Sequence, residues 1–165
     1  METIIERQRA TIAEHLRAEN AKEWAAVYDT FIQSENAYFD VVPLSTRFKG
    51  ISGVKDFYQL VHAALPDFQI KITSQFDTPG CSILELTLAG THQGEYCGVP
   101  ASGNSVSFEV AIFYLFGAGS EADKLVAERV YFDNEMLLRQ MRGEENAPTG
   151  IGLANIAGQS ASAGN

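Results

Sequence analysis

The chain has 165 residues, of which 45% are hydrophobic, and this length and composition suit one domain with its own core. Its formal net charge is −9, from 12 basic and 21 acidic residues. The basic residues are scattered, which argues against nucleic-acid binding because that requires Lys and Arg clustered on one surface. No apolar run approaches the roughly 20 residues that span a bilayer, and the charged N-terminus lacks the hydrophobic region of a signal peptide. We therefore expect a cytoplasmic protein that binds neither nucleic acid nor membrane.

The first part of the chain predicts three helices. One covers residues 3–17, where apolar side chains recur on one side. The second begins near Asn20, because Asn20 and Glu23 have the spacing of a capping box. The third covers residues 54–65, with Ser52 as its expected N-cap and a proline directly after it.

After this third helix the hydrophobic period changes from 3.6 to 2, which indicates strands. Alternating patterns cover residues 68–72, 84–88, 106–116 and 125–132. The turns between the last three are too short for a parallel crossover, so antiparallel pairing is expected. A short helix over residues 134–141 closes the domain.

Helices followed by a run of strands predict the α+β class, with a curved antiparallel sheet wrapped over the N-terminal helices. Such a sheet forms a cone with an internal pocket. We place this domain at residues 1–143 and interpret residues 144–165, which are rich in Gly, Ala and Ser, as a flexible tail. Both faces of the strand at 106–116 carry apolar residues, so we expect a homodimer packed through the sheets.

The sequence lacks the local motifs that hold metals and common cofactors. Cys81 and Cys97 form no CxxC pair, and the simplest interpretation is two free thiols. His15, His62 and His92 are too far apart in the chain for a local metal site. No nucleophile elbow, glycine-rich phosphate loop or zinc-protease motif occurs. We therefore expect no metal and no cofactor, while the sequence leaves open whether distant residues meet in the fold.

Four segments, taken in order, resemble those of a known family. Two of them read Gly-Ile-Ser-Gly-Val-Lys-Asp-Phe and Leu-Pro-Asp-Phe. Residues 90–109 contain Gly-Thr-His-Gln-Gly and a Gly-Val-Pro-Ala-Ser-Gly turn, and residues 124–141 contain a closing strand, an aspartate and Leu-Leu-Arg-Gln. The chain resembles the SnoaL-like polyketide cyclases and ester cyclases over roughly residues 10–142. The resemblance implies the cone-shaped fold of nuclear-transport-factor-like proteins.

The resemblance also implies a chemistry. The family's founding members close a polyketide ring by intramolecular aldol condensation without a metal or cofactor, which requires a base and an acid. A carboxylate in an apolar pocket suits this task because desolvation raises its pKa toward neutrality. The resemblance assigns Asp133 as the acid/base, and His92 is the candidate partner of the substrate oxygen. Each has a structural alternative, since Asp133 is also a suitable N-cap for the last helix and His92 can bond the backbone at a strand end.

Other polar residues are weaker candidates for the site. Glu109 and Arg129 lie in the middle of strands and are expected to face solvent or form cross-strand ion pairs. Asp40 follows two aromatic residues near the expected pocket mouth, but its sequence match is poor. Aromatic residues at helical or strand spacing are candidate pocket walls, and we expect at most half of them to touch a ligand. They are Trp24, Tyr28, Phe57, Tyr58, Phe108 and Tyr131.

These features support three alternative functions, each with a small hydrophobic molecule as the partner. The first is a cofactor-independent cyclase or related isomerase acting on a hydrophobic carbonyl compound. The second is a protein that binds such a ligand without converting it. The third is a small hydrolase, for example of epoxides. A buried Asp133 facing the pocket favours an enzyme, whereas a capping Asp133 favours a binding protein.

Overall fold

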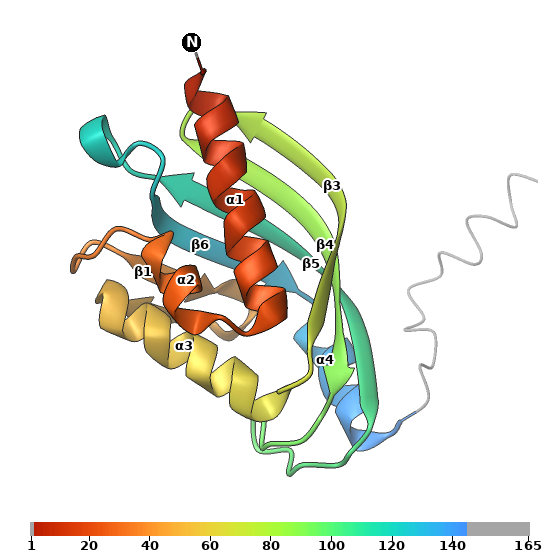
Figure 1. The fold of residues 1–165 in the computed structure, drawn as a ribbon. Coiled ribbons are helices and arrows are strands. Elements are labelled where there is room, and N and C mark those ends of the chain that lie inside the picture. The colour runs from red at the N-terminus through yellow and green to blue at the C-terminus, as the bar shows by residue number, and fades with distance from the viewer. Residues whose placement is uncertain (1, 145–165) are drawn as a thin grey trace, which may run out of the picture.

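The structure is a computed structural model that describes residues 2–144, so the predicted tail beyond residue 144 lies outside the described residues. Its α-helices are α1 (Ile4–Ala21), α2 (Trp24–Asp29), α3 (Gly50–Ala64) and α4 (Asn134–Arg142). Its strands are β1 (Tyr38–Val41), β2 (Thr46–Lys49), β3 (Gln69–Thr78), β4 (Cys81–Thr91), β5 (Ser105–Phe116) and β6 (Leu125–Phe132). Two short 3-10 turns are η1 (Val42–Leu44) and η2 (Gly119–Glu121). Helices α1, α2 and α3 lie on the concave side of one curved sheet, and α4 lies at one end of it (Figure 1).

The sheet is mixed, with strand order β2-β1-β6-β5-β4-β3. All neighbouring strands are antiparallel except β1 and β6, which run parallel. The predicted α+β class with a curved sheet over N-terminal helices is therefore confirmed, as is the antiparallel pairing expected of the last three strands. The sheet as a whole was expected to be antiparallel and is mixed instead, because β1 pairs in parallel with β6. The expected strands 68–72, 84–88, 106–116 and 125–132 lie within or overlap β3 to β6. Strands β1 and β2 have four residues each, too few for a recognisable alternation.

Helix α1 is longer than its sequence pattern predicts. Thr3 and Glu6 form a capping box at its start, and the helix continues through Asn20, where a second helix was expected to begin. The Asn20 side chain instead bonds both backbone groups of Ile70 on β3, at 2.7 and 3.0 Å. This tertiary contact fixes the end of α1 against the sheet, and α2 begins four residues later at Trp24.

Helix α3 starts earlier than predicted and without the expected cap. Its N-cap is Lys49, whose side chain makes no capping bond, and Ser52 lies inside the helix. The chain enters α3 at Gly50 with φ +71°, a conformation that favours glycine. A Cβ at Gly53 would lie 2.8 Å from the backbone carbon of Phe48. The close packing of α3 on β2 therefore depends on this glycine.

The two faces of the sheet differ in composition. On β5 the concave face carries Val106, Phe108, Val110, Ile112, Tyr114 and Phe116, all buried. The convex face carries aromatic and aliphatic residues in register across three strands, of which Ile83 and Phe113 are partly buried and Phe76 is exposed. Tyr131 on β6 contacts Phe113 edge-on. Within residues 2–144, no helix is both long and apolar enough to cross a membrane.

Candidate active site

A cavity of about 460 Å³ lies between α3 and the concave face of the sheet. Its walls are mainly apolar and come from α3, β1, β2, β4, β5 and β6. The aromatic residues that line it are Phe39, Phe48, Phe57, Tyr96, Phe108 and Phe132. This volume and apolar lining are typical of sites for small organic molecules.

Two buried carboxyl groups interrupt the apolar wall of this cavity. Glu19 lies near the end of α1 and is 8% exposed, and Glu128 lies on β6 and is 2% exposed. Glu128 faces inward because it is paired with the inward-facing Tyr114 of β5. A third acid, Glu95, lies at the exposed rim of the cavity.

Behind the two carboxyl groups lies His15, which is completely buried. The Thr30 hydroxyl donates to the carbonyl of Val27 at 2.6 Å, so it accepts a bond from Nδ1–H of His15 at 2.8 Å. Nε2 of His15 lies 3.0 Å from Oε1 of Glu128 and 3.6 Å from Oε2 of Glu19. With Nδ1 already a donor, a second proton on Nε2 makes His15 an imidazolium between two carboxylates.

Tyr58 of α3 completes this cluster. Its hydroxyl donates to Oε1 of Glu128 at 2.8 Å and lies 3.0 Å from Nε2 of His15. Since its proton goes to Glu128, its oxygen accepts from the histidine. We refer to His15, Glu19, Tyr58 and Glu128 as the acidic cluster. It joins α1, α3 and β6, three elements far apart in the sequence.

The environment of the acidic cluster shifts the pKa values of its members. Burial raises the pKa of Glu19 to about 7; His15 and Lys22 oppose this rise, and Glu128 adds to it. Burial disfavours the charged form of His15, but the charges of Glu128 and Glu19 outweigh it and raise the pKa of the imidazole. Glu19 can therefore gain and lose a proton near neutral pH, as general acid–base catalysis requires.

Asp133, the acid/base implied by the family resemblance, lies outside the cavity lining. It is exposed at the end of β6, and its carboxylate accepts a 2.9 Å bond from the backbone N–H of Met136. This is the N-cap geometry for α4. The structure therefore supports the structural alternative for Asp133, and its catalytic role stays a prediction.

His92 also lies outside the lining, in the loop between β4 and β5. It is completely buried, and its Nδ1 lies 3.0 Å from the Ser102 hydroxyl. Its backbone N–H donates to Asn104 and its carbonyl accepts from Gly103. His92 thus holds the loop together, and the structure does not bring it together with Asp133.

Two of the six aromatic residues expected at the pocket, Phe57 and Phe108, line the cavity. Trp24, Tyr28 and Tyr58 pack around one another outside the lining, with ring centroids of Trp24 and Tyr28 about 6 Å from Tyr58. Tyr131 lies on the convex face of the sheet.

The remaining polar candidates lie on the convex face. Asp40 pairs with Arg47 at 2.6 Å and with Arg129 at 3.3 Å across β2, β1 and β6. Glu109 accepts a 2.8 Å bond from the hydroxyl of Thr87 on the neighbouring strand. The cross-strand pairing expected of Arg129 is therefore present. None of these residues reaches the cavity.

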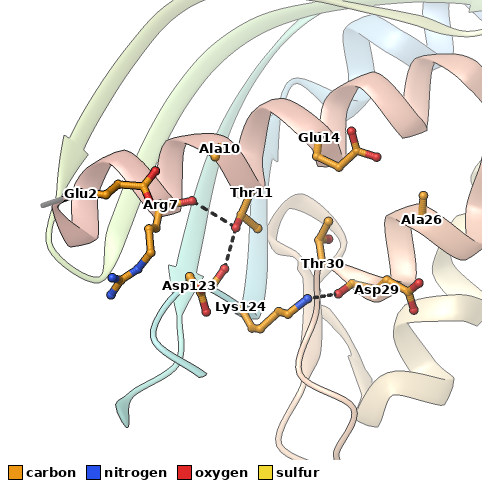
Figure 2. Close-up of a pocket in the computed structure, with 10 residues that line it drawn as sticks. All are labelled: Glu2, Arg7, Ala10, Thr11, Glu14, Ala26, Asp29, Thr30, Asp123 and Lys124. Atoms are coloured by element: carbon orange, nitrogen blue, oxygen red, sulfur yellow. Dashed lines mark hydrogen bonds between the residues drawn. The ribbon is translucent and has the colours of Figure 1, made fainter. Parts of the chain in front are cut away.

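A second hollow of about 520 Å³ lies on the surface beside α1, and most of the residues that line it are polar or charged (Figure 2). Many of its polar groups already bond each other: Thr11 donates to the carbonyl of Asp123 at 2.7 Å, and Lys124 donates to the carbonyl of Asp29 at 2.6 Å. Thr30 lies in its wall and contacts His15 on the other side. We therefore interpret this hollow as surface structure that supports the acidic cluster from behind.

Of the acidic cluster, only Tyr58 was predicted from the sequence, as a candidate pocket wall. That His15, Glu19 and Glu128 meet was not predicted, although two signals point to them. His15 and Glu19 are four residues apart on α1, next to the buried Ile12 and Leu16, and so share the inward side of the helix. Glu128 precedes Arg129 in a strand, where neighbouring side chains point to opposite faces. One of these two charges therefore had to face the core.

Comparison with known proteins identifies the same fold. The family model for SnoaL-like polyketide cyclase matches residues 9–141. AclR from Streptomyces galilaeus, assigned as a hydroxylase, superimposes with a TM-score of 0.71 at 22% identity, covering 95% of this chain and 94% of AclR. IdmH from Streptomyces antibioticus, assigned as a polyketide cyclase, gives 0.66 at 18% identity, covering 82% of this chain and 98% of IdmH. Among curated proteins, none matches the chain closely enough to count as a relative.

Proposed function

Because the chain belongs to the SnoaL-like polyketide cyclase family, we propose that it catalyses acid–base chemistry on a small hydrophobic carbonyl compound. The reaction is ring closure of the intramolecular aldol type or a related isomerisation, carried out by the protein's own side chains. The observation that carries this proposal is the pair of buried carboxyl groups, Glu19 and Glu128, in the wall of an apolar cavity. Such chemistry needs a group that takes a proton from carbon and returns it to oxygen.

Glu19 is the proposed catalytic group. As a carboxylate it removes a proton from the carbon next to the substrate carbonyl. The resulting enolate attacks a second carbonyl of the same molecule, and protonated Glu19 then returns the proton to the new alkoxide oxygen. A pKa of about 7 makes both protonation states accessible at neutral pH.

His15 and Tyr58 act as positioning residues because they do not line the cavity. Their bonds to Glu128 fix that carboxylate in the wall. The imidazolium 3.6 Å from Glu19 favours the charged form of that carboxyl group and so opposes the effect of burial. This opposition keeps the pKa of Glu19 near the working pH instead of far above it.

One observation favours the second candidate, a protein that binds a ligand without converting it. Asp133, the family's acid/base position, caps α4 and does not line the cavity. If the family chemistry requires that aspartate, the cavity of this chain only binds. The two functions make opposite predictions for proton transfer.

Exchange of carbon-bound protons in heavy water separates these functions. The probe is 2-tetralone, a bicyclic ketone with acidic protons beside its carbonyl, followed by NMR with and without the protein. We expect the wild-type protein to accelerate exchange, and Glu19→Gln to reduce that acceleration about 100-fold or more. Asp133→Asn should leave it little changed.

Three outcomes contradict the proposal in different ways. Loss of exchange in Asp133→Asn alone would support the assignment made from the family resemblance. An exchange rate in Glu19→Gln equal to that of the wild type would show that Glu19 does not transfer the proton. Saturable binding of tetralone to the wild-type protein without accelerated exchange would support the binding function.

A further inference from the structure

The carboxyl group of Glu19 ends in the cavity without a hydrogen-bond donor from residues 2–144. The nearest candidate, Nε2 of His15, lies 3.6 Å away, beyond hydrogen-bond distance. Lys22 donates to the backbone carbonyl of Glu19 and not to its carboxyl group. A carboxyl group without a donor on a side chain that is only 10% exposed is costly. It is therefore suited to a donor that a ligand brings into the cavity.

The charges around the cavity favour one kind of donor. Its charged lining residues are all acidic, namely Glu19, Glu95 and Glu128. Of the described part of the chain, no Lys, Arg or His lines the cavity, and His15 is shielded behind Glu128. A carboxylate or phosphate group would meet like charges and no counter-charge there, whereas a cation would meet an available carboxylate.

The apolar walls are also compatible with a cation that carries a hydrophobic body. Phe39 and Phe57 stack with ring centroids 3.6 Å apart, and Phe48 meets Phe57 edge-on at 5.6 Å. These three rings form part of the lining. Aromatic faces attract ammonium groups as well as apolar rings, and more strongly where water is excluded. A volume of about 460 Å³ accommodates a bicyclic or tricyclic molecule.

We propose that the cavity binds hydrophobic amines in their ammonium form, with the ammonium group donating to Glu19, and that it excludes anions of the same size. This inference goes beyond the proposed function, because it concerns ligand charge and holds whether or not the protein turns a substrate over. The ammonium group would donate hydrogen bonds to the carboxyl group of Glu19, and the hydrocarbon part of the amine would lie against the phenylalanine rings.

The protonation of Glu19 makes this binding depend on pH. The titratable groups that shift the pKa of Glu19 are His15 of α1, Glu128 of β6 and Lys22, which follows α1 directly. Glu19 in turn helps to raise the pKa values of Tyr58 on α3 and Tyr114 on β5. Burial raises the pKa of Glu19 to about 7, so a large fraction of the carboxyl groups is protonated below that pH. An arriving ammonium group must displace this proton. Affinity for amines should therefore rise between pH 6 and pH 8.

Calorimetry with three naphthalene probes of one size tests the proposal. The probes are 2-naphthylmethylamine as the ammonium, 2-naphthalenemethanol as the neutral alcohol and 2-naphthoate as the anion. At pH 8 we expect the amine to bind about tenfold or more tightly than the alcohol, and the naphthoate to bind undetectably. At pH 6 the preference for the amine should shrink, and amine binding should release protons, seen as a dependence of the heat on the buffer's ionisation enthalpy.

The variant Glu19→Gln should bind amine and alcohol with similar affinity, while the matched control Glu109→Gln on the convex face should keep the preference. Binding of the alcohol shows that each variant is folded, and the buffer dependence of the wild-type protein tests the proposal without any variant. Tight binding of naphthoate, an unchanged amine preference in Glu19→Gln, or amine binding without proton release at pH 6 would each overturn it. Failure of tetralone exchange alone would overturn only the proposed function.

Discussion

Replacing Glu19 with glutamine should stabilise the protein at alkaline pH while removing its proposed catalytic group. Burial raises the pKa of Glu19 in the folded state from the ordinary 4.5 to about 7. Between these values the folded state holds a proton that the unfolded state has released. Stability is therefore lost as pH rises through this range, and the loss is complete above about pH 7. Glutamine does not ionise and avoids this loss.

The magnitude follows from the two pKa values. The difference between 4.5 and about 7 corresponds to about 3 kcal/mol, since one pKa unit corresponds to about 1.4 kcal/mol. The variant also removes a charge that raises the pKa of His15. The raised pKa of His15 stabilises the folded state until the pH rises through it, so the variant loses part of this contribution. We therefore expect a net gain of about 2 kcal/mol at pH 8 and of less than about 1 kcal/mol at pH 5.

Urea unfolding followed by circular dichroism at pH 5 and pH 8 measures both values. The control Glu109→Gln removes one carboxylate from the solvent-exposed face and should change stability equally at the two pH values. A Glu19→Gln protein that is no more stable than the wild type at pH 8 would refute the argument. That result would mean that water or a local rearrangement already relieves the buried carboxyl group.

Three further predictions concern other parts of the molecule. Tyr58→Phe removes the donor to Glu128 and should cost about 1–3 kcal/mol in urea unfolding, because a buried acceptor loses its partner; a loss near zero would show that the bond contributes little. Asp133→Ala removes the bond to the Met136 amide and should cost about 1 kcal/mol while tetralone exchange persists; lost exchange in a folded variant would contradict the cap-only role. Phe113→Lys places a charge on the convex face and should convert a wild-type dimer into a monomer in analytical ultracentrifugation at micromolar concentration, and a monomeric wild-type protein would contradict the expected homodimer.

The sequence predicted the parts of the fold that depend on local periodicity. The long alternation that became β5 and the apolar stripe of α3 follow from side-chain spacing alone, since each buries one regular face. Helix boundaries were less predictable. Asn20 and Glu23 have the spacing of a helix start, yet Asn20 bonds Ile70, fifty residues away, and this contact overrides the local signal.

Of the residues that line the cavity, only Phe57 and Phe108 were predicted from the sequence. The buried charged members of the site come from α1 and β6, more than one hundred residues apart in the chain, and they meet only in the folded protein, where Nε2 of His15 lies 3.0 Å from Oε1 of Glu128. Local spacing carries no information on such pairing. Asp133 shows a second reason why the site was hard to predict. An aspartate at a strand end is suited both to catalysis and to capping the next helix, and here it caps α4.

The two proposed roles of Glu19 can be tested against each other, because both depend on the same carboxyl group. If Glu19 moves the proton of a ketone and also binds ammonium groups, hydrophobic amines must inhibit tetralone exchange competitively. Since amine binding requires the carboxylate, inhibition should be stronger at pH 8 than at pH 6, following the pKa of about 7 of this group. NMR exchange rates measured with increasing 2-naphthylmethylamine at the two pH values give the inhibition constants. Amine binding that leaves exchange unaffected would mean that the ketone reacts elsewhere in the cavity, and Glu128 would then become the candidate for the proton-transferring group.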